Sequence, residues 1–275
     1  MTHDEEHPMT PATTTATVTE HAYVEGSATD RPRDARRAAV ALAVASGLAI
    51  AGFTVLGAVF EYPQILEEPT ADVLALFREH QSAVRVWFGV LVVGAALMAP
   101  AAFWLGRVVG GTLGRAIAVT GIGAAVVQVI GLQRWVTLIP GVARDALDPS
   151  RRVAAEERFE LLHTVLGKVI GETVGYALTA TFTVLVALAL HRTVLRPWLT
   201  RLGYVAGALI ATGVVIPFVE PASLTNFGGY VLWCLWLLLV AGVLVRRADD
   251  FVDEPTVVAD VVTSPPTAGA SPARR

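Results

Sequence analysis

The sequence predicts an all-α protein that crosses a membrane six times. Hydrophobic residues make up 54% of the chain and charged residues only 16%, whereas a soluble domain carries about 25% charged residues. The mean hydropathy is +0.57. Each of six apolar segments is long enough for a helix to cross the hydrocarbon layer, which needs roughly 20 residues. These segments are continuously apolar rather than alternating, which excludes the strands of a membrane barrel.

The six predicted spans form one membrane domain between two polar tails. We expect the domain over residues 38–247 and disordered cytoplasmic tails over residues 1–37 and 248–275. The expected spans cover residues 38–60, 85–107, 113–140, 161–190, 198–219 and 226–246. The first tail lacks a basic start followed by a short apolar core, so we expect no signal peptide and a first span that stays in the membrane.

Arginines near the span ends predict the orientation. Four of them precede the first span: Arg31, Arg33, Arg36 and Arg37. Others flank the second and fourth loops and follow the last span, while the loops on the opposite side are longer and more acidic. Because cytoplasmic flanks carry an excess of basic residues, we expect a multi-pass protein of the bacterial inner (plasma) membrane with both termini in the cytoplasm.

Each of the two long outer loops is expected to contain an amphipathic helix at the outer face. In the first loop, Thr70 is the expected cap of a helix that lies at the interface. In the second, Asp148 is the expected cap and Pro149 the first helical residue. That second helix is expected to continue into the fourth span, and Pro140 is expected to end the third.

Three ionisable residues lie inside the predicted spans: Arg134, Lys168 and Glu172. A charge at bilayer depth costs at least ~2.5–3.5 kcal/mol, so it usually has a function. Lys168 and Glu172 are four residues apart and therefore share a helix face. Arg134 falls on the glycine face of the third span, where a neighbouring helix can approach closely. We therefore expect Arg134 to contact Glu172 near the outer end of the bundle.

The charges in this group do not balance, because two positive residues face one negative residue. Lys168 could lose its proton on burial, or extend out of the bundle to the interface. Alternatively, an anionic ligand or another carboxylate could complete the site. Glu61 and Glu220 are the acidic residues at outer helix ends, and we favour an added carboxylate with Glu61 first.

Further candidate site residues surround these charges. A polar stripe on the fourth span comprises Thr164, Lys168, Glu172, Gly175, Tyr176, Thr179 and Thr183. Trp135 follows Arg134 at the outer boundary, where aromatic residues commonly form a belt. His163 is the only histidine inside or bordering a span. The sequence thus predicts a ligand-binding or ion-pair site of Arg134, Lys168, Glu172, Tyr176, Trp135, His163 and Glu61.

Several classes of function are disfavoured. The net charge of −3 does not indicate nucleic-acid binding. The single cysteine, Cys234, can form neither an intrachain disulfide nor a cysteine metal cluster. No phosphate-binding glycine loop, zinc-binding helix or serine elbow is present. We expect no cofactor and no metal, and an enzyme is not favoured. The expected partners are the lipid bilayer, a small-molecule or ion ligand, and a second copy of the chain in a homodimer.

Four segments carry a resemblance to a known family. They are Tyr62-Pro63-Gln64-Ile65-Leu66, Gly131-Leu132-Gln133-Arg134-Trp135, Leu138-Ile139-Pro140-Gly141-Val142-Ala143, and His163 with Gly171-Glu172-Thr173-Val174-Gly175-Tyr176. Over residues 38–247 the chain resembles the bacterial membrane family catalogued as domain of unknown function 4386. The resemblance implies a six-helix inner-membrane protein and no particular activity.

Three functions remain open at this point. The first is binding or movement of a small molecule or ion through a polar pocket open to the outer face. The second is a structural or regulatory role in which the buried charges only fix helix packing. The third is a membrane-embedded enzyme or redox protein that uses His163 and Glu172. A bis-histidine haem would require a second histidine, and His80 is the available one.

Overall fold

The computed structural model describes residues 30–191, 193–216, 219 and 222–251, and this described part is helical without a β-strand. Six helices in it are long and apolar enough to cross a membrane. They are α1 (Arg31–Phe60), α3 (Gln81–Val109), α4 (Gly111–Thr137) continued by α5 (Ile139–Asp145), α6 (Arg152–Leu162) continued by η2 (His163–Val174) and α7 (Gly175–Leu190), α8 (Pro197–Ala211) continued by η3 (Thr212–Val215), and α9 (Ala222–Arg246). The chain is therefore a multi-pass membrane protein, as the composition predicted.

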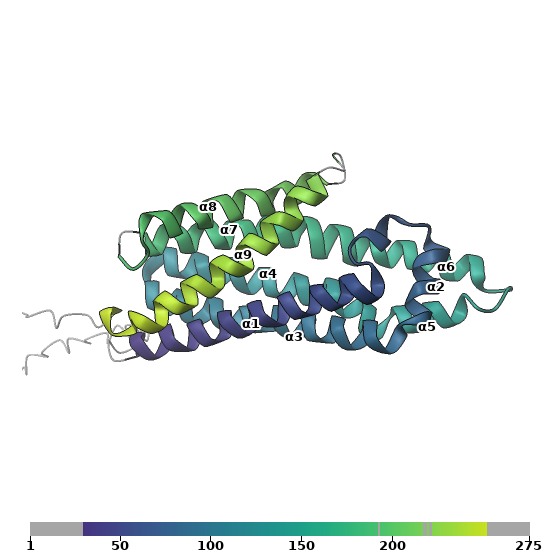
Figure 1. Cartoon of the computed structure of the whole chain (residues 1–275), viewed down its shortest axis with the longest axis horizontal. Coiled ribbons are helices and arrows are strands. Elements are labelled where there is room, and N and C mark those ends of the chain that lie inside the picture. The colour runs from purple at the N-terminus through teal and green to yellow at the C-terminus, as the bar shows by residue number, and fades with distance from the viewer. Residues whose placement is uncertain (1–29, 192, 217–218, 220–221, 252–275) are drawn as a thin grey trace, which may run out of the picture.

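The long helices run side by side, and the two ends of the bundle differ (Figure 1). At one end, α1 begins and α9 ends, followed by the short helix η4 (Ala248–Phe251), which packs on α1. We call this the terminal end. At the other end, α2 (Thr70–Glu79) packs against α5 and α6. We call this the capped end. The expected tails fall largely outside the described residues, but residues 31–37 form the first turns of α1 rather than a separate segment.

Local backbone geometry sets the turns between neighbouring helices. Helix α1 ends at Phe60 and is followed by its C-cap residue Glu61, which has a left-handed φ of 51° and whose backbone N–H donates to the Leu56 carbonyl. Between α3 and α4, Gly110 and Gly111 adopt φ values of 71° and 58°, which glycine tolerates without steric cost. Pro197 lies in the first turn of α8, where its missing N–H is not needed.

Small residues allow α1, α3 and α4 to pack closely. A methyl group at Gly106 of α3 would lie 2.6 Å from the carbonyl oxygen of Gly114 on α4. A methyl group at Gly94 would lie 3.3 Å from the carbonyl oxygen of Ala45 on α1. Such close backbone approach is how helices associate in lipid, where apolar burial alone gives little gain.

Two large hydrophobic clusters hold the bundle together, and a third, small cluster of Ala35, Val108 and Ala248 lies at the terminal end. The larger joins all the long helices and includes Leu105, Phe182 and Trp236, whose indole Nε1 donates to the Leu199 carbonyl at 2.9 Å. The second of the two is rich in aromatic rings and lies at the capped end. It contains Phe60, Phe77, Phe88, Trp135 and Phe159. This second cluster, which we call the aromatic cluster, covers the region where the charged site was expected.

The structure corrects the expected helix starts in the outer loops. Pro69 precedes the first helical residue of α2, and the Thr70 hydroxyl donates to Glu160 at 3.3 Å instead of capping its own helix. The Asp148 carboxylate accepts from the Ser150 backbone and hydroxyl, a local turn that competes with capping, so α6 begins only at Arg152.

The third span also ends differently from the expectation. Helix α4 ends at Thr137, and Pro140 lies in the first turn of α5, where proline is tolerated because its N–H is not needed. The chain thus continues as helix at this end of the bundle instead of leaving it. The corresponding candidate span reaches Asp145.

Candidate functional site

The candidate site begins with Arg134, which lies in the last turn of α4 and is only 4% exposed. Glycines on α4 and on the facing helix η2 make this burial possible. A methyl group at Gly131 would lie 2.9 Å from Gly171 Cα, and one at Gly167 would lie 2.7 Å from Arg134 Nη2. The expectation that Arg134 points into the bundle on a glycine-lined face is therefore what the structure shows.

The guanidinium has few hydrogen-bond partners. Arg134 Nη1 donates to the Gly131 carbonyl, and Nη2 lies 3.4 Å from His163 Nδ1. Arg134 Nε has no partner in the described part of the chain. Because a guanidinium can only donate, His163 Nδ1 must accept, which places the imidazole proton on Nε2. That Nε2 is also buried without a partner among the described residues.

Glu172 is near Arg134 without touching it. The two charges interact electrostatically, yet among the described residues no carboxylate lies at ion-pair distance from the Arg134 guanidinium. Glu172 is half-buried on η2. The expected direct contact between Arg134 and Glu172 is thus replaced by a longer-range interaction across the α4–η2 interface.

Lys168 does not share the environment of Glu172. It is exposed, whereas Glu172 is half-buried. Both residues lie in His163–Val174, which is a π-helix. The stripe of polar residues is exposed at Thr164 and Lys168 and becomes buried at Thr179 and Thr183.

The structure brings Tyr62, and not Glu61, toward the charges. Glu61 is exposed at the end of α1. Tyr62 packs edge-on against Phe88 with ring centroids 5.3 Å apart. Burial, reinforced by the Glu172 carboxylate, raises the pKa of Tyr62 to about 12. Glu61 therefore does not complete the site, and Glu220 lies outside the described residues. The phenol of Tyr62 was overlooked because only acidic residues were considered as partners for the positive charges.

Trp135 belongs to the aromatic cluster, and His163 lies at the edge of that cluster. Trp135 is fully buried, which differs from the expected position in an exposed aromatic belt. It stacks on Phe88 with centroids 5.1 Å apart, and its ring lies 5.4 Å from the Arg134 guanidinium carbon. His163 stacks on Phe159 at 5.8 Å. These rings cover Arg134 from the capped end. His80 lies elsewhere, with its Nε2 3.8 Å from Glu79 Oε1.

Polar side chains continue from the charges toward the middle of the bundle. Tyr176, one turn beyond Glu172, contacts Tyr230 of α9 with ring centroids 5.6 Å apart. Gln128 of α4 donates from Nε2 to the Tyr230 hydroxyl at 3.3 Å. Tyr176 was predicted as a site residue because it shares the polar stripe of Glu172, whereas Gln128 and Tyr230 lie on other helices and were not predicted.

Six apolar helices around a buried guanidinium define the class as an integral membrane protein with a polar site inside its bundle. A family model matches residues 38–241, and the chain belongs to that family, which is described as a domain of unknown function (DUF4386). No curated protein and no solved structure matches the chain. The resemblance noted in the sequence is confirmed, with nearly the same boundaries.

Proposed function

We propose that the protein binds a small polar molecule between Arg134 and Glu172, with an acidic group of the ligand facing the guanidinium. The observation that supports this is the incomplete pairing of Arg134. Two of its nitrogens have a partner and Nε has none in the described part of the chain. A buried charge normally has a counter-charge or a full set of hydrogen bonds. A bound acceptor would supply both.

Arg134 requires an acidic group on the ligand, and Glu172 adds a second requirement. Its carboxylate interacts with Arg134 at a distance, so a molecule between them would meet one positive and one negative group. A donor or cationic group on the ligand would complement Glu172 while the acidic group complements Arg134. A small zwitterion satisfies both. The long π-helical segment supports the same location, because π-helical turns are frequent at functional sites.

We place this site near the outer edge of the inner (plasma) membrane, with the terminal end in the cytoplasm. Arg31, Arg33, Arg36 and Arg37 at the start of α1 support that orientation. Along α4, Arg115 and Arg134 are 19 residues apart, which is about 28 Å at 1.5 Å per residue. That length is close to the ~30 Å thickness of the hydrocarbon layer. Arg134 would then lie just inside the outer interface.

A structural role for the same residues is the second candidate. Gly131 and Gly171 are in backbone contact, and the Arg134 guanidinium packs on Gly167 and Trp135. These contacts would hold α4 against η2 without any ligand. In that case Arg134 serves helix packing, and its open Nε is satisfied by water.

A thermal-shift measurement in detergent, followed by tryptophan fluorescence, separates the two candidates. Wild type is compared with Arg134→Met, Glu172→Gln and Arg85→Met, which removes an exposed arginine at the capped end. The probes are glycine, acetate, inorganic phosphate and ethylammonium. Binding predicts a saturable rise in melting temperature with glycine or acetate that Arg134→Met abolishes and Arg85→Met retains. Glu172→Gln should remove the preference for glycine over acetate. No shift with any probe would favour the structural role.

A further inference from the structure

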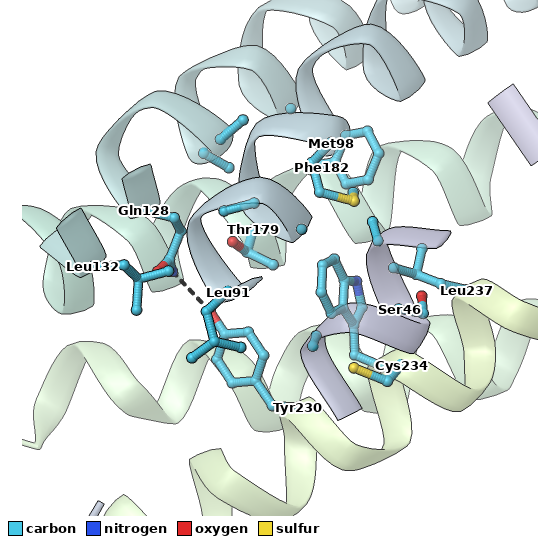
Figure 2. Close-up of a pocket in the computed structure, with 18 of the residues that line it drawn as sticks. Ser46, Leu91, Met98, Gln128, Leu132, Thr179, Phe182, Tyr230, Cys234 and Leu237 are labelled. Carbon is cyan, nitrogen blue, oxygen red and sulfur yellow. Dashed lines mark hydrogen bonds between the residues drawn. The ribbon is translucent and has the colours of Figure 1, made fainter. Parts of the chain in front are cut away.

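A cavity lies in the middle of the bundle, away from the charges. Its volume is about 80 Å³, and it is lined by residues of α1, α3, α4, α7 and α9. Figure 2 shows Leu91, Met98, Phe182 and Leu237 around it, with Gln128 and Tyr230 joined by a hydrogen bond at one side. The residues that line it do not include Arg134, Lys168 or Glu172. It is therefore separate from the site of the proposed function.

The cavity exists because small side chains line several helices at the same level. These are Ala45, Ala49, Gly94, Ala95, Gly121, Ala124 and Ala125. Close packing is the rule in protein interiors, and an empty space forfeits dispersion contacts on all its walls. A bundle surrounded by lipid can recover these contacts by admitting an apolar molecule from the membrane.

Two buried donors on the wall have no partner within the described part of the chain. Ser46 of α1 is 1% exposed, and its hydroxyl makes no hydrogen bond. Trp233 of α9 is 8% exposed, and its indole Nε1 makes none either. An indole N–H can only donate, so whatever satisfies it must carry an acceptor. Unpaired buried polar groups are rare enough in folded proteins to need an explanation.

The wall also restricts the charge of the occupant. None of the residues that line the cavity is ionisable at neutral pH, since its polar members are hydroxyl, amide, indole and thiol groups. A charged ligand would lose its hydration there without a counter-ion. A neutral molecule with an apolar body and a hydrogen-bond acceptor fits both conditions.

We infer that this cavity binds a neutral lipophilic molecule from the membrane through a carbonyl oxygen that accepts from Ser46 and Trp233. Gln128 and Tyr230 also line the cavity and provide further polar contacts for a second oxygen. Two kinds of membrane constituent share this chemistry: the ring carbonyls of an isoprenoid quinone and the ester carbonyls of a glycerolipid.

Equilibrium binding of radiolabelled probes to the full chain in detergent tests the inference. The probes are a decyl-substituted benzoquinone and dioctanoylglycerol, with decane as a probe that lacks an acceptor. Saturable binding of either carbonyl probe, and none of decane, is the expected result. The probe that binds more tightly then identifies the source of the carbonyl. Equal binding of decane, or no saturable binding of either carbonyl probe, would overturn the inference.

Variants of the two donors locate the binding. Trp233→Phe and Ser46→Ala each remove one donor and leave the shape of the wall almost unchanged, and each should raise the Kd at least fivefold. Trp198→Phe, which alters an exposed tryptophan outside the cavity, should leave the Kd unchanged. Wild-type Kd values in both donor variants would contradict the assignment. If Trp233→Phe fails to fold, Ser46→Ala alone decides it.

Discussion

The two ends of the bundle treat a buried charge in opposite ways. At the terminal end, Asp34 is 2% exposed and is held by two arginines, with Arg107 Nε 2.8 Å and Arg37 Nη1 3.3 Å from its oxygens. At the capped end, Arg134 is 4% exposed, and no described carboxylate touches it. The first charge is neutralised by the protein itself. The second is covered but not neutralised by contact.

The two buried charges differ in how much of their surroundings is exposed to solvent. The partners of Asp34 are 41% and 59% exposed, so their remaining donors keep their water. Arg134 is enclosed by the aromatic cluster and by the glycines of η2, which supply almost no acceptors. The charge of Asp34 is therefore neutralised by ion pairs, although its Oδ2 makes no hydrogen bond among the described residues, whereas Arg134 has neither a carboxylate at ion-pair distance nor a partner for Nε there. This contrast is the physical basis for placing a ligand at the capped end.

The largest expected effect is at Asp34. Asp34→Asn removes the negative charge that two arginines share, and we expect the free energy of unfolding to fall by about 1.5–3 kcal/mol. Thermal or denaturant unfolding in detergent measures it. Asp30→Asn is the matched control, because Asp30 is 42% exposed and 3.8 Å from Arg107, and its loss should be far smaller. Equal losses in the free energy of unfolding for the two variants would show that the burial of Asp34 does not strengthen its ion pairs.

The next effect concerns the helix contact that buries Arg134. Gly131→Ala places a methyl group 2.9 Å from the backbone of Gly171, which neither helix can avoid without moving. We expect a loss of about 1–3 kcal/mol from overpacking. Gly47→Ala is the control, since nothing lies within 4 Å of its added methyl group. If both variants unfold like wild type, α4 and η2 are not in close contact.

A pH effect is expected from Tyr62. Its pKa of about 12 in the folded protein lies above the ordinary value of 10.0 for a tyrosine, so the folded state holds the phenolic proton more tightly than the unfolded state. The stabilisation is complete below pH 10 and is lost as the pH rises from about 10 toward 12. Melting temperatures measured across this range should fall less steeply for Tyr62→Phe than for wild type. Identical slopes would mean that Tyr62 is not buried near Glu172.

The smallest effect is expected for an exposed pair at the terminal end. Arg36 Nη2 lies 2.9 Å from Asp249 Oδ1, with side chains 54% and 78% exposed. Water competes for both groups, so Arg36→Ala should change the free energy of unfolding by less than about 0.5 kcal/mol. Unfolding in low and high salt measures the difference. A loss as large as that of Asp34→Asn would show that exposure does not distinguish the ion pairs of this end.

Much of the fold could be predicted because the length of an apolar run is a property of the sequence alone. The burial of Arg134 could also be predicted, because the spacing of the glycines in the sequence places them on the same face of an α-helix as Arg134. The exposure of Lys168 was not predictable, because a shared helix face does not reveal which part of that face the neighbouring helices cover. Asp34 was overlooked among arginines that had been read only for orientation. Tyr62 faces the site in place of Glu61 because the chain turns at Glu61 with a left-handed φ.

Native mass spectrometry of the detergent-purified protein tests most directly whether Arg134 holds a ligand. We predict that wild type retains a small polar molecule that Arg134→Met releases and Arg85→Met keeps. The same adduct on wild type and on Arg134→Met, or bare protein for all three, would contradict a ligand at the capped end.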